Sequence, residues 1–258
     1  LKLKLRKCQF AKSSTTYLGH VISDKGVTPD PEKTKALGKL KTPKNVREVR
    51  SFLGMSGFYR KFIKSYAETA LPLTRLTQKN VKFGWTVECE NSFREIISQL
   101  QLTPLLSHPD ISKPYILFTD ASDNAIIAIL TQTVTGSEED LRPIYFLSHK
   151  LSRSQRKYST ILKEAYAINF ALQKLDCYLH GTEFIIRTDH KPLTHLLTAN
   201  FDNKLLQRYA LNISCYKCEI QYCPGASNFT ADILSRHVDH ESSDSESAQT
   251  ENPIIKLK

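Results

Sequence analysis

The stretch Pro114-Tyr-Ile-Leu-Phe-Thr-Asp120 indicates the fold class, because a continuous apolar run leads directly to a carboxylate. The apolar residues 115–118 are typical of a central strand that is buried on both faces of its sheet. A further strand, expected over 184–188, also ends at an acid, Asp189. Ligands bind at such strand ends in sheets that carry helices on their faces. The sequence therefore predicts an α/β fold with candidate ligand-binding acids at the ends of two strands.

Hydrophobic periodicity predicts the other elements of the C-terminal half. Over 158–179 the apolar residues recur at helical spacing, which indicates a long amphipathic helix. Further strands are expected at 126–131, 144–147 and 218–223, short helices at 191–198 and 203–213, and a last helix from Asn228 to Arg236.

The N-terminal half is predicted to be mostly helical. A strand, a turn and a returning strand are expected near 17–26, because Asp24-Lys-Gly26 follows an apolar run. Helices are expected at 32–40, 45–53, 58–67 and about 87–101, with Gly54 and Gly57 interrupting the second helix.

Basic residues lie on two of these helices and could contact phosphate. At 45–53 the apolar side chains share one face, so the basic side chains of that segment lie on another. The candidates for phosphate contacts are Lys44, Arg47 and Arg50, followed by Arg60, Lys61 and Lys64 on the next helix.

The net charge of +10 is unevenly distributed along the 258 residues. Residues 1–80 hold 18 Lys and Arg against 5 Asp and Glu, whereas residues 81–236 hold 16 of each. Residues 237–258 hold 2 Lys against 5 acids. This pattern indicates a polyanionic partner for the first third only, with a merely solvated basic face as the alternative.

Four acids could converge on one point of the predicted fold: Asp120, Glu164, Asp189 and Asp232. Each acid taken singly could be a helix cap, an ion-pair partner or a surface charge. Clustered carboxylates repel each other, and a divalent cation resolves that repulsion. All-oxygen ligands favour Mg²⁺ or Mn²⁺ over zinc, and two ions about 4 Å apart can orient a water for attack on a phosphodiester.

Other classes of protein fit the sequence poorly. The longest apolar run, 125–130, is far shorter than the roughly 20 residues of a membrane span, and the first residues lack the apolar centre of a signal peptide. We therefore expect neither a membrane protein nor a secreted one. Cys215, Cys218 and Cys223 have the spacing of half a zinc site, but a fourth ligand is missing nearby.

Four motifs of the C-terminal half contain or surround the candidate acids: Thr119-Asp-Ala-Ser122, Tyr158-Ser-Thr-Ile-Leu-Lys-Glu-Ala-Tyr-Ala-Ile168, Thr188-Asp-His-Lys-Pro-Leu193 and Pro224-Gly-Ala-Ser-Asn-Phe-Thr-Ala-Asp-Ile-Leu-Ser-Arg236. Together they resemble the ribonuclease H domain of gypsy-class LTR retrotransposon Pol polyproteins. Upstream, Tyr17-Leu-Gly-His20, Pro29-Asp-Pro31, Val49-Arg-Ser-Phe-Leu-Gly54 and Phe58-Tyr-Arg-Lys-Phe62 resemble the palm end and thumb of the same reverse transcriptase.

This resemblance implies a division of the chain. Residues 1–30 correspond to the end of the palm, 31–78 to the thumb and 79–113 to a connecting segment. Residues 114–236 correspond to the ribonuclease H-like domain, and 237–258 are expected to form an acidic, disordered tail. The first residue is not Met, which fits a piece of a longer polyprotein.

The resemblance also implies a fold, a reaction and a ligand set. The fold is a five-stranded mixed sheet flanked by helices, preceded by a small helical thumb and connection. The reaction is hydrolysis of the RNA strand of RNA–DNA hybrids, with Asp120, Glu164, Asp189 and Asp232 binding two Mg²⁺ ions, or Mn²⁺. The implied partners are the hybrid, template–primer nucleic acid and the rest of the Pol polyprotein, in the cytoplasm, a retroelement particle or the nucleus.

Three departures from the family pattern qualify these expectations. Ile127 stands where the family usually has Gly, and His149 where it commonly has Arg. The sequence has no Tyr-x-Asp-Asp motif, so we expect no DNA polymerisation from this chain alone.

The alternative function is therefore a catalytically inactive, nucleic-acid-binding remnant of a retroelement. A module that binds a partner through its acidic tail is a weaker hypothesis.

Overall fold

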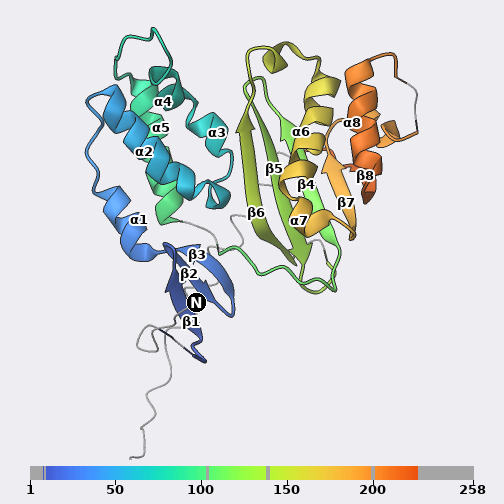
Figure 1. The fold of residues 1–258 in the computed structure, drawn as a ribbon, viewed down its shortest axis with the longest axis horizontal. Helices are drawn as coiled ribbons and strands as arrows, with labels where there is room; N and C mark the ends of the chain where they lie inside the picture. The colour runs from blue at the N-terminus through green and yellow to red at the C-terminus, as the bar shows by residue number, and fades with distance from the viewer. Residues whose placement is uncertain (1–7, 9, 103–104, 138–139, 199–200, 226–258) are drawn as a thin grey trace, which may run out of the picture.

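The computed structural model describes residues 8, 10–102, 105–137, 140–198 and 201–225 (Figure 1). The predicted last helix and the acidic tail lie outside these residues. Within them, no helix combines the length and the apolar character that crossing a membrane requires.

A small antiparallel sheet opens the described chain. Strands β1 (Ser14–Tyr17), β2 (His20–Ser23) and β3 (Gly26–Pro29) pair in that order. The predicted turn and returning strand are confirmed as the β2–β3 pair, whereas Leu18 and Gly19 form a further turn within the strand predicted from Tyr17. Gly26 has a φ of +147°, and an added Cβ there would lie 2.2 Å from the carbonyl oxygen of Leu106. Glycine is therefore required where β3 contacts the later part of the chain.

Helices follow this sheet and form the body shown on the left of Figure 1. They are α1 (Pro31–Gly38), α2 (Val46–Phe58), η2 (Arg60–Phe62), α3 (Tyr66–Thr69), α4 (Leu71–Leu76) and α5 (Val87–Gln101). We call residues 31–101 the helical part. Its core includes Val49, Phe52, Phe93 and Ile96, so α2 and α5 share one apolar interior.

Two helix predictions in this part are wrong in their limits. Helix α2 begins after the N-cap Asn45, but it continues through both glycines to Phe58. The helix expected at 58–67 is broken, because Ser65 adopts the left-handed conformation with a φ of +55° between η2 and α3. Burial of neighbouring side chains stabilises this break despite its local cost.

The C-terminal half is built on a five-stranded mixed sheet, as predicted. Its strands are β4 (Tyr115–Ala121), β5 (Ala125–Thr133), β6 (Leu141–Lys150), β7 (Glu183–Thr188) and β8 (Lys217–Tyr222), in the order β6-β5-β4-β7-β8. The β4–β5 and β5–β6 pairs are antiparallel, whereas β4–β7 and β7–β8 are parallel.

Helices α6 (Thr160–Lys174) and α8 (Lys204–Ser214) pack on one face of this sheet (Figure 1). The helix expected at 158–179 is interrupted at Leu175 and resumes as α7 (Asp176–Leu179). Two short 3₁₀ helices, η4 (Gln155–Lys157) and η5 (Lys191–His195), complete the connections.

The helical part packs against the β4–β5–β6 side of the opposite sheet face. Phe118 of β4 and Phe146 of β6 belong to the same apolar cluster as Phe62, Ile63 and Ala70. A hydrogen bond from the backbone N–H of Ala67 to Ser148 Oγ, 3.0 Å, joins the two parts at this interface. The helical part therefore completes the core of the sheet.

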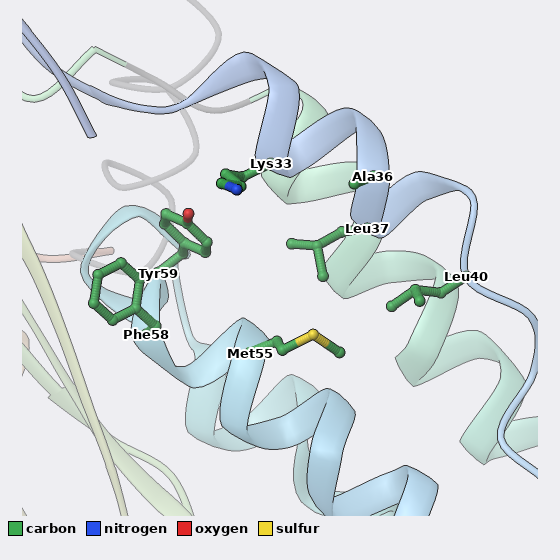
Figure 2. Close-up of a pocket in the computed structure, with 7 residues that line it drawn as sticks. All are labelled: Lys33, Ala36, Leu37, Leu40, Met55, Phe58 and Tyr59. Atoms are coloured by element: carbon green, nitrogen blue, oxygen red, sulfur yellow. The ribbon is translucent and has the colours of Figure 1, made fainter. Parts of the chain in front are cut away.

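A separate apolar hollow of about 330 Å³ lies between α1 and α2. Figure 2 shows the side chains of Leu37 and Met55 extending into it from the two helices. Its lining residues are Lys33, Ala36, Leu37, Leu40, Met55, Phe58 and Tyr59.

Candidate metal centre

The sheet topology brings three of the four candidate acids together. Strands β4 and β7 are parallel neighbours, and Thr119 pairs with Thr188. Asp120 and Asp189 follow these paired residues, so the two acids lie beside each other at one edge of the sheet. Glu164 reaches the same edge from α6, and one carboxylate oxygen from each acid lies within 4.8 Å of the others.

Glu164 is the most constrained of these carboxylates. Its side chain is buried, with 3% of the residue exposed, and its Oε1 accepts a hydrogen bond of 3.1 Å from the backbone N–H of Ala121. Its Oε2 is buried without a hydrogen-bond partner among the described residues. A buried carboxylate oxygen without a partner is costly, and a cation among the three acids would satisfy it. The donor set therefore fits a hard divalent cation.

The electrostatics of the triad favour protonation when no cation is present. Burial, followed by the charges of Asp120 and Asp189, raises the pKa of Glu164 to about 8. Burial and then the charge of Asp189 also raise the pKa of Asp120. A bound divalent cation would reverse this balance, because it stabilises the ionised carboxylates.

Asp232, the fourth candidate, lies outside the described residues. The geometry therefore tests the convergence of Asp120, Glu164 and Asp189 and leaves the contribution of Asp232 a prediction. Among the residues that the structure describes, this triad is also the only group of three or more His, Cys, Asp or Glu side chains close enough to share a metal ion.

The six basic candidates occupy two different environments. Lys44, Arg47, Arg50 and Arg60 are exposed, and Arg50 also donates a hydrogen bond to the Thr77 carbonyl at 3.3 Å. Lys61 and Lys64 are half-buried. The Lys61 ammonium lies 5.0 Å from the centre of the Phe62 ring. Lys64 is close enough to the triad that the charge of Asp120 raises its pKa, against the larger lowering effect of burial.

One residue near the site was not predicted from the sequence. Glu68 of α3 is half-buried, and its charge contributes to the raised pKa of Asp120. No motif or periodicity in the sequence points to Glu68, because its effect on Asp120 depends on how α3 packs against the sheet.

Ile127, at the position where the resemblance leads us to expect Gly, lies directly beside the candidate metal centre. It pairs with Asp120 across the β4–β5 ladder and is half-buried. The three carboxylates still gather around its neighbour Asp120. Ile127 is therefore compatible with the assembled triad.

Comparison with known proteins agrees with this architecture. Residues 110–216 match the family described as "RNase H-like domain found in reverse transcriptase". A structure of the foamy viral protease-reverse transcriptase in complex with an RNA/DNA hybrid has a TM-score of 0.68 at 19% identity, covering 98% of this chain and 33% of that one. The same foamy viral protein in complex with dsDNA has a TM-score of 0.67 at 21% identity, covering 83% and 45%. These likenesses show the fold.

Sequence relatives cover nearly the whole chain. The retrovirus-related Pol polyproteins of the Drosophila melanogaster transposons 412 and opus are 36% and 38% identical to it, each over 92% of this chain. The Tf2-3 polyprotein of Schizosaccharomyces pombe is 38% identical over 90% of it. The chain spans only 19%, 24% and 18% of the lengths of these three relatives. Residues 110–216 therefore form an RNase H-like domain of the kind found in reverse transcriptase, and nearly the whole chain is similar to one part of transposon Pol polyproteins.

Proposed function

We propose that this part of the polyprotein is a Mg²⁺-dependent endonuclease that hydrolyses the RNA strand of RNA–DNA hybrids. The observation that carries the proposal is the buried, unpartnered Oε2 of Glu164 within a carboxylate triad on an RNase H-like sheet. Asp120, Glu164 and Asp189, together with Asp232, are the proposed ligands. They would hold two Mg²⁺ ions, and Mn²⁺ would substitute.

The chain's own residues would prepare the site for this reaction. The Ala121 N–H orients Glu164, and burial excludes water from the inner side of the triad. Asp189 is exposed and would face the incoming phosphodiester. When bound, the divalent cations would polarise a water and stabilise the leaving oxygen, so that the products carry 3′-hydroxyl and 5′-phosphate ends.

The exposed basic residues of the helical part would hold the nucleic acid. Lys44, Arg47, Arg50 and Arg60 are available for phosphate contacts, whose strength falls as salt concentration rises. Hybrid duplexes would be recognised by groove shape, phosphates and 2′-hydroxyls. The foamy viral complex with an RNA/DNA hybrid supports a hybrid as substrate for this fold.

The longer relatives support a proposal for the wider context of this part. We assign residues 1–30 to the palm end, 31–78 to the thumb, 79–113 to a connection and 114–236 to the nuclease domain. The rest of the Pol polyprotein is the proposed partner, and an intracellular site of action, in the cytoplasm, a retroelement particle or the nucleus, follows from that role.

Cleavage of a labelled RNA–DNA hybrid tests the proposal directly. The chain is incubated with hybrid, duplex DNA or duplex RNA in Mg²⁺, Mn²⁺ or EDTA, with Asp120→Asn as the matched control. We expect RNA-strand cleavage of the hybrid only, dependent on the cation and lost in the variant. Salt-sensitive hybrid binding with no cleavage beyond that of Asp120→Asn would instead support the inactive remnant, for which the unusual Ile127 is the motivation.

A further inference from the structure

A row of three paired residues leads from the metal centre to the helical part. Asp120 pairs with Ile127 of β5, and Ile127 pairs with Ser148 of β6. Directly opposed residues of antiparallel strands point to the same face of a sheet. At the end of the row, Ser148 Oγ accepts a hydrogen bond from the Ala67 N–H of α3, 3.0 Å. The sheet face on which Asp120 projects is therefore the face that α3 covers.

Two charged residues flank Ala67 at this contact. Lys64 precedes α3 and Glu68 lies within it, and both side chains are half-buried. Neighbouring strands are about 4.8 Å apart, so β6 lies about 10 Å from β4. A lysine side chain that starts above β6 can span much of that distance. Burial lowers the pKa of Lys64, and the charge of Asp120 acts in the opposite direction.

The backbone around Lys64 is fixed by its neighbours. Phe62 and Ile63 before it and Ala70 after α3 are each 1% exposed within the shared core. Ser65 holds the left-handed turn that directs the chain from η2 into α3. In the part of the chain that the structure describes, no hydrogen bond or ion pair engages the Lys64 ammonium with another partner. The backbone of Lys64 is thus held at the sheet face toward which Asp120 projects.

We propose that Lys64 is a positioning residue of the metal centre: its ammonium is a resident positive charge beside Asp120 that partly neutralises the carboxylates and competes electrostatically with a divalent cation. Glu68 acts with the opposite sign and favours the cation. The inference rests on the proposed function, because it requires the triad to bind a divalent cation. Through the charges of Lys64 and Glu68, the helical part would change the affinity of the triad for a divalent cation.

Isothermal titration of Mn²⁺ into the full chain, without nucleic acid, tests this inference. Removing the Lys64 charge in Lys64→Met is expected to tighten Mn²⁺ binding about 3- to 10-fold, because like charges at short range in a partly buried site repel. Glu68→Gln is expected to weaken binding about 2- to 5-fold. Lys64→Arg retains the charge and is expected to restore the parental affinity.

Lys150→Met is the matched control. Lys150 is also a half-buried lysine at the interface with the helical part, but its ammonium donates a hydrogen bond to Thr74 Oγ1 at 3.1 Å. The charge of Lys150 is not among the causes of the raised pKa of Asp120 or of Glu164. We expect its Mn²⁺ affinity to equal that of the parent. Circular dichroism in EDTA verifies that each variant is folded, and Glu68→Gln alone decides the inference should Lys64→Met not fold.

The outcomes separate the two proposals. Absence of Mn²⁺ binding by the parent would overturn the proposed function. Parental binding that Asp120→Asn abolishes, with Lys64→Met and Glu68→Gln unchanged, would overturn only the role of Lys64. A lowered melting temperature of Lys64→Met with unchanged Mn²⁺ affinity would also overturn it, because that pattern shows a purely structural lysine.

Discussion

The backbone N–H of Ala121 donates a hydrogen bond of 3.1 Å to Glu164 Oε1, so the last residue of β4 fixes the buried carboxylate of α6. The other oxygen of this carboxylate has no hydrogen-bond partner among the described residues. Glu164 is therefore oriented from one side and left available on the other, as a metal ligand must be. The following predictions begin with the consequences of this arrangement.

Replacing Glu164 by Gln should stabilise the metal-free protein at alkaline pH. The folded state raises the pKa of Glu164 from 4.5 to about 8, so it retains a proton that the unfolded chain releases. Stability of the parent therefore falls as pH rises from 4.5 to about 8, and the Gln variant lacks this loss. We expect Glu164→Gln to be more stable by on the order of 5 kcal/mol at pH 8.5, and by less than about 1 kcal/mol at pH 5. Urea unfolding in EDTA measures this, and an equal difference at both pH values would contradict it.

Metal binding should release a proton near neutral pH. Because the pKa of Glu164 is about 8 without metal, a cation must displace its proton at pH 7. Affinity for Mg²⁺ is therefore expected to rise with pH and to level off above about pH 8. Calorimetric titration in buffers of different ionisation enthalpy counts the released protons. Identical binding enthalpies in all buffers would show that Glu164 is already ionised.

Phe62→Ala should destabilise the whole described fold. Phe62 is 1% exposed and lies in one cluster with Phe118 of the sheet, so its truncation leaves a cavity in the shared core. Such a truncation costs about 3–5 kcal/mol. Urea unfolding followed by Trp85 fluorescence and by circular dichroism should shift as one transition. The control Phe10→Ala, at a residue 75% exposed, should shift little. Separate transitions for the two probes would argue against a common core.

Gly26→Ala should weaken the link between the small sheet and the chain after α5. A methyl group at residue 26 would meet the Leu106 carbonyl oxygen, and the φ of +147° disfavours any other residue. We expect a loss of about 2–4 kcal/mol in the free energy of unfolding. Gly84→Ala is the control, since an added Cβ there meets nothing within 4 Å. Equal stability of the two variants would show that the contact at Leu106 is dispensable.

Ile127→Gly tests whether Ile127 slows the proposed cleavage of the hybrid. Ile127 is a half-buried strand residue beside Asp120, and glycine there loses packing and gains unfolded-state entropy. We expect a destabilisation of about 2 kcal/mol without faster hybrid cleavage. The assay compares cleavage rates at a temperature where both proteins are folded. A rate increase of tenfold or more in the glycine variant would show that Ile127 obstructs the site.

The part of the fold that follows from local pattern was predictable. The apolar run of β4, the spacing of α6 and the acids after β4 and β7 depend on near neighbours in the chain, and they predicted both the sheet and the triad. The broken helix at Ser65 and the approach of Glu68 to Asp120 did not follow from the sequence. Both depend on contacts between segments far apart in the chain, which no local periodicity records.

The shared core has a consequence for how this protein can be divided. The recognised domain begins at residue 110, yet Phe118 and Phe146 are covered by helices that precede it. A cut at that boundary would turn a buried sheet face toward water and invite aggregation. The C-terminal half is therefore not an independent folding unit at that boundary. Any transfer of this half to another protein, by design or by recombination, has to include the preceding helices, because they cover one face of its sheet.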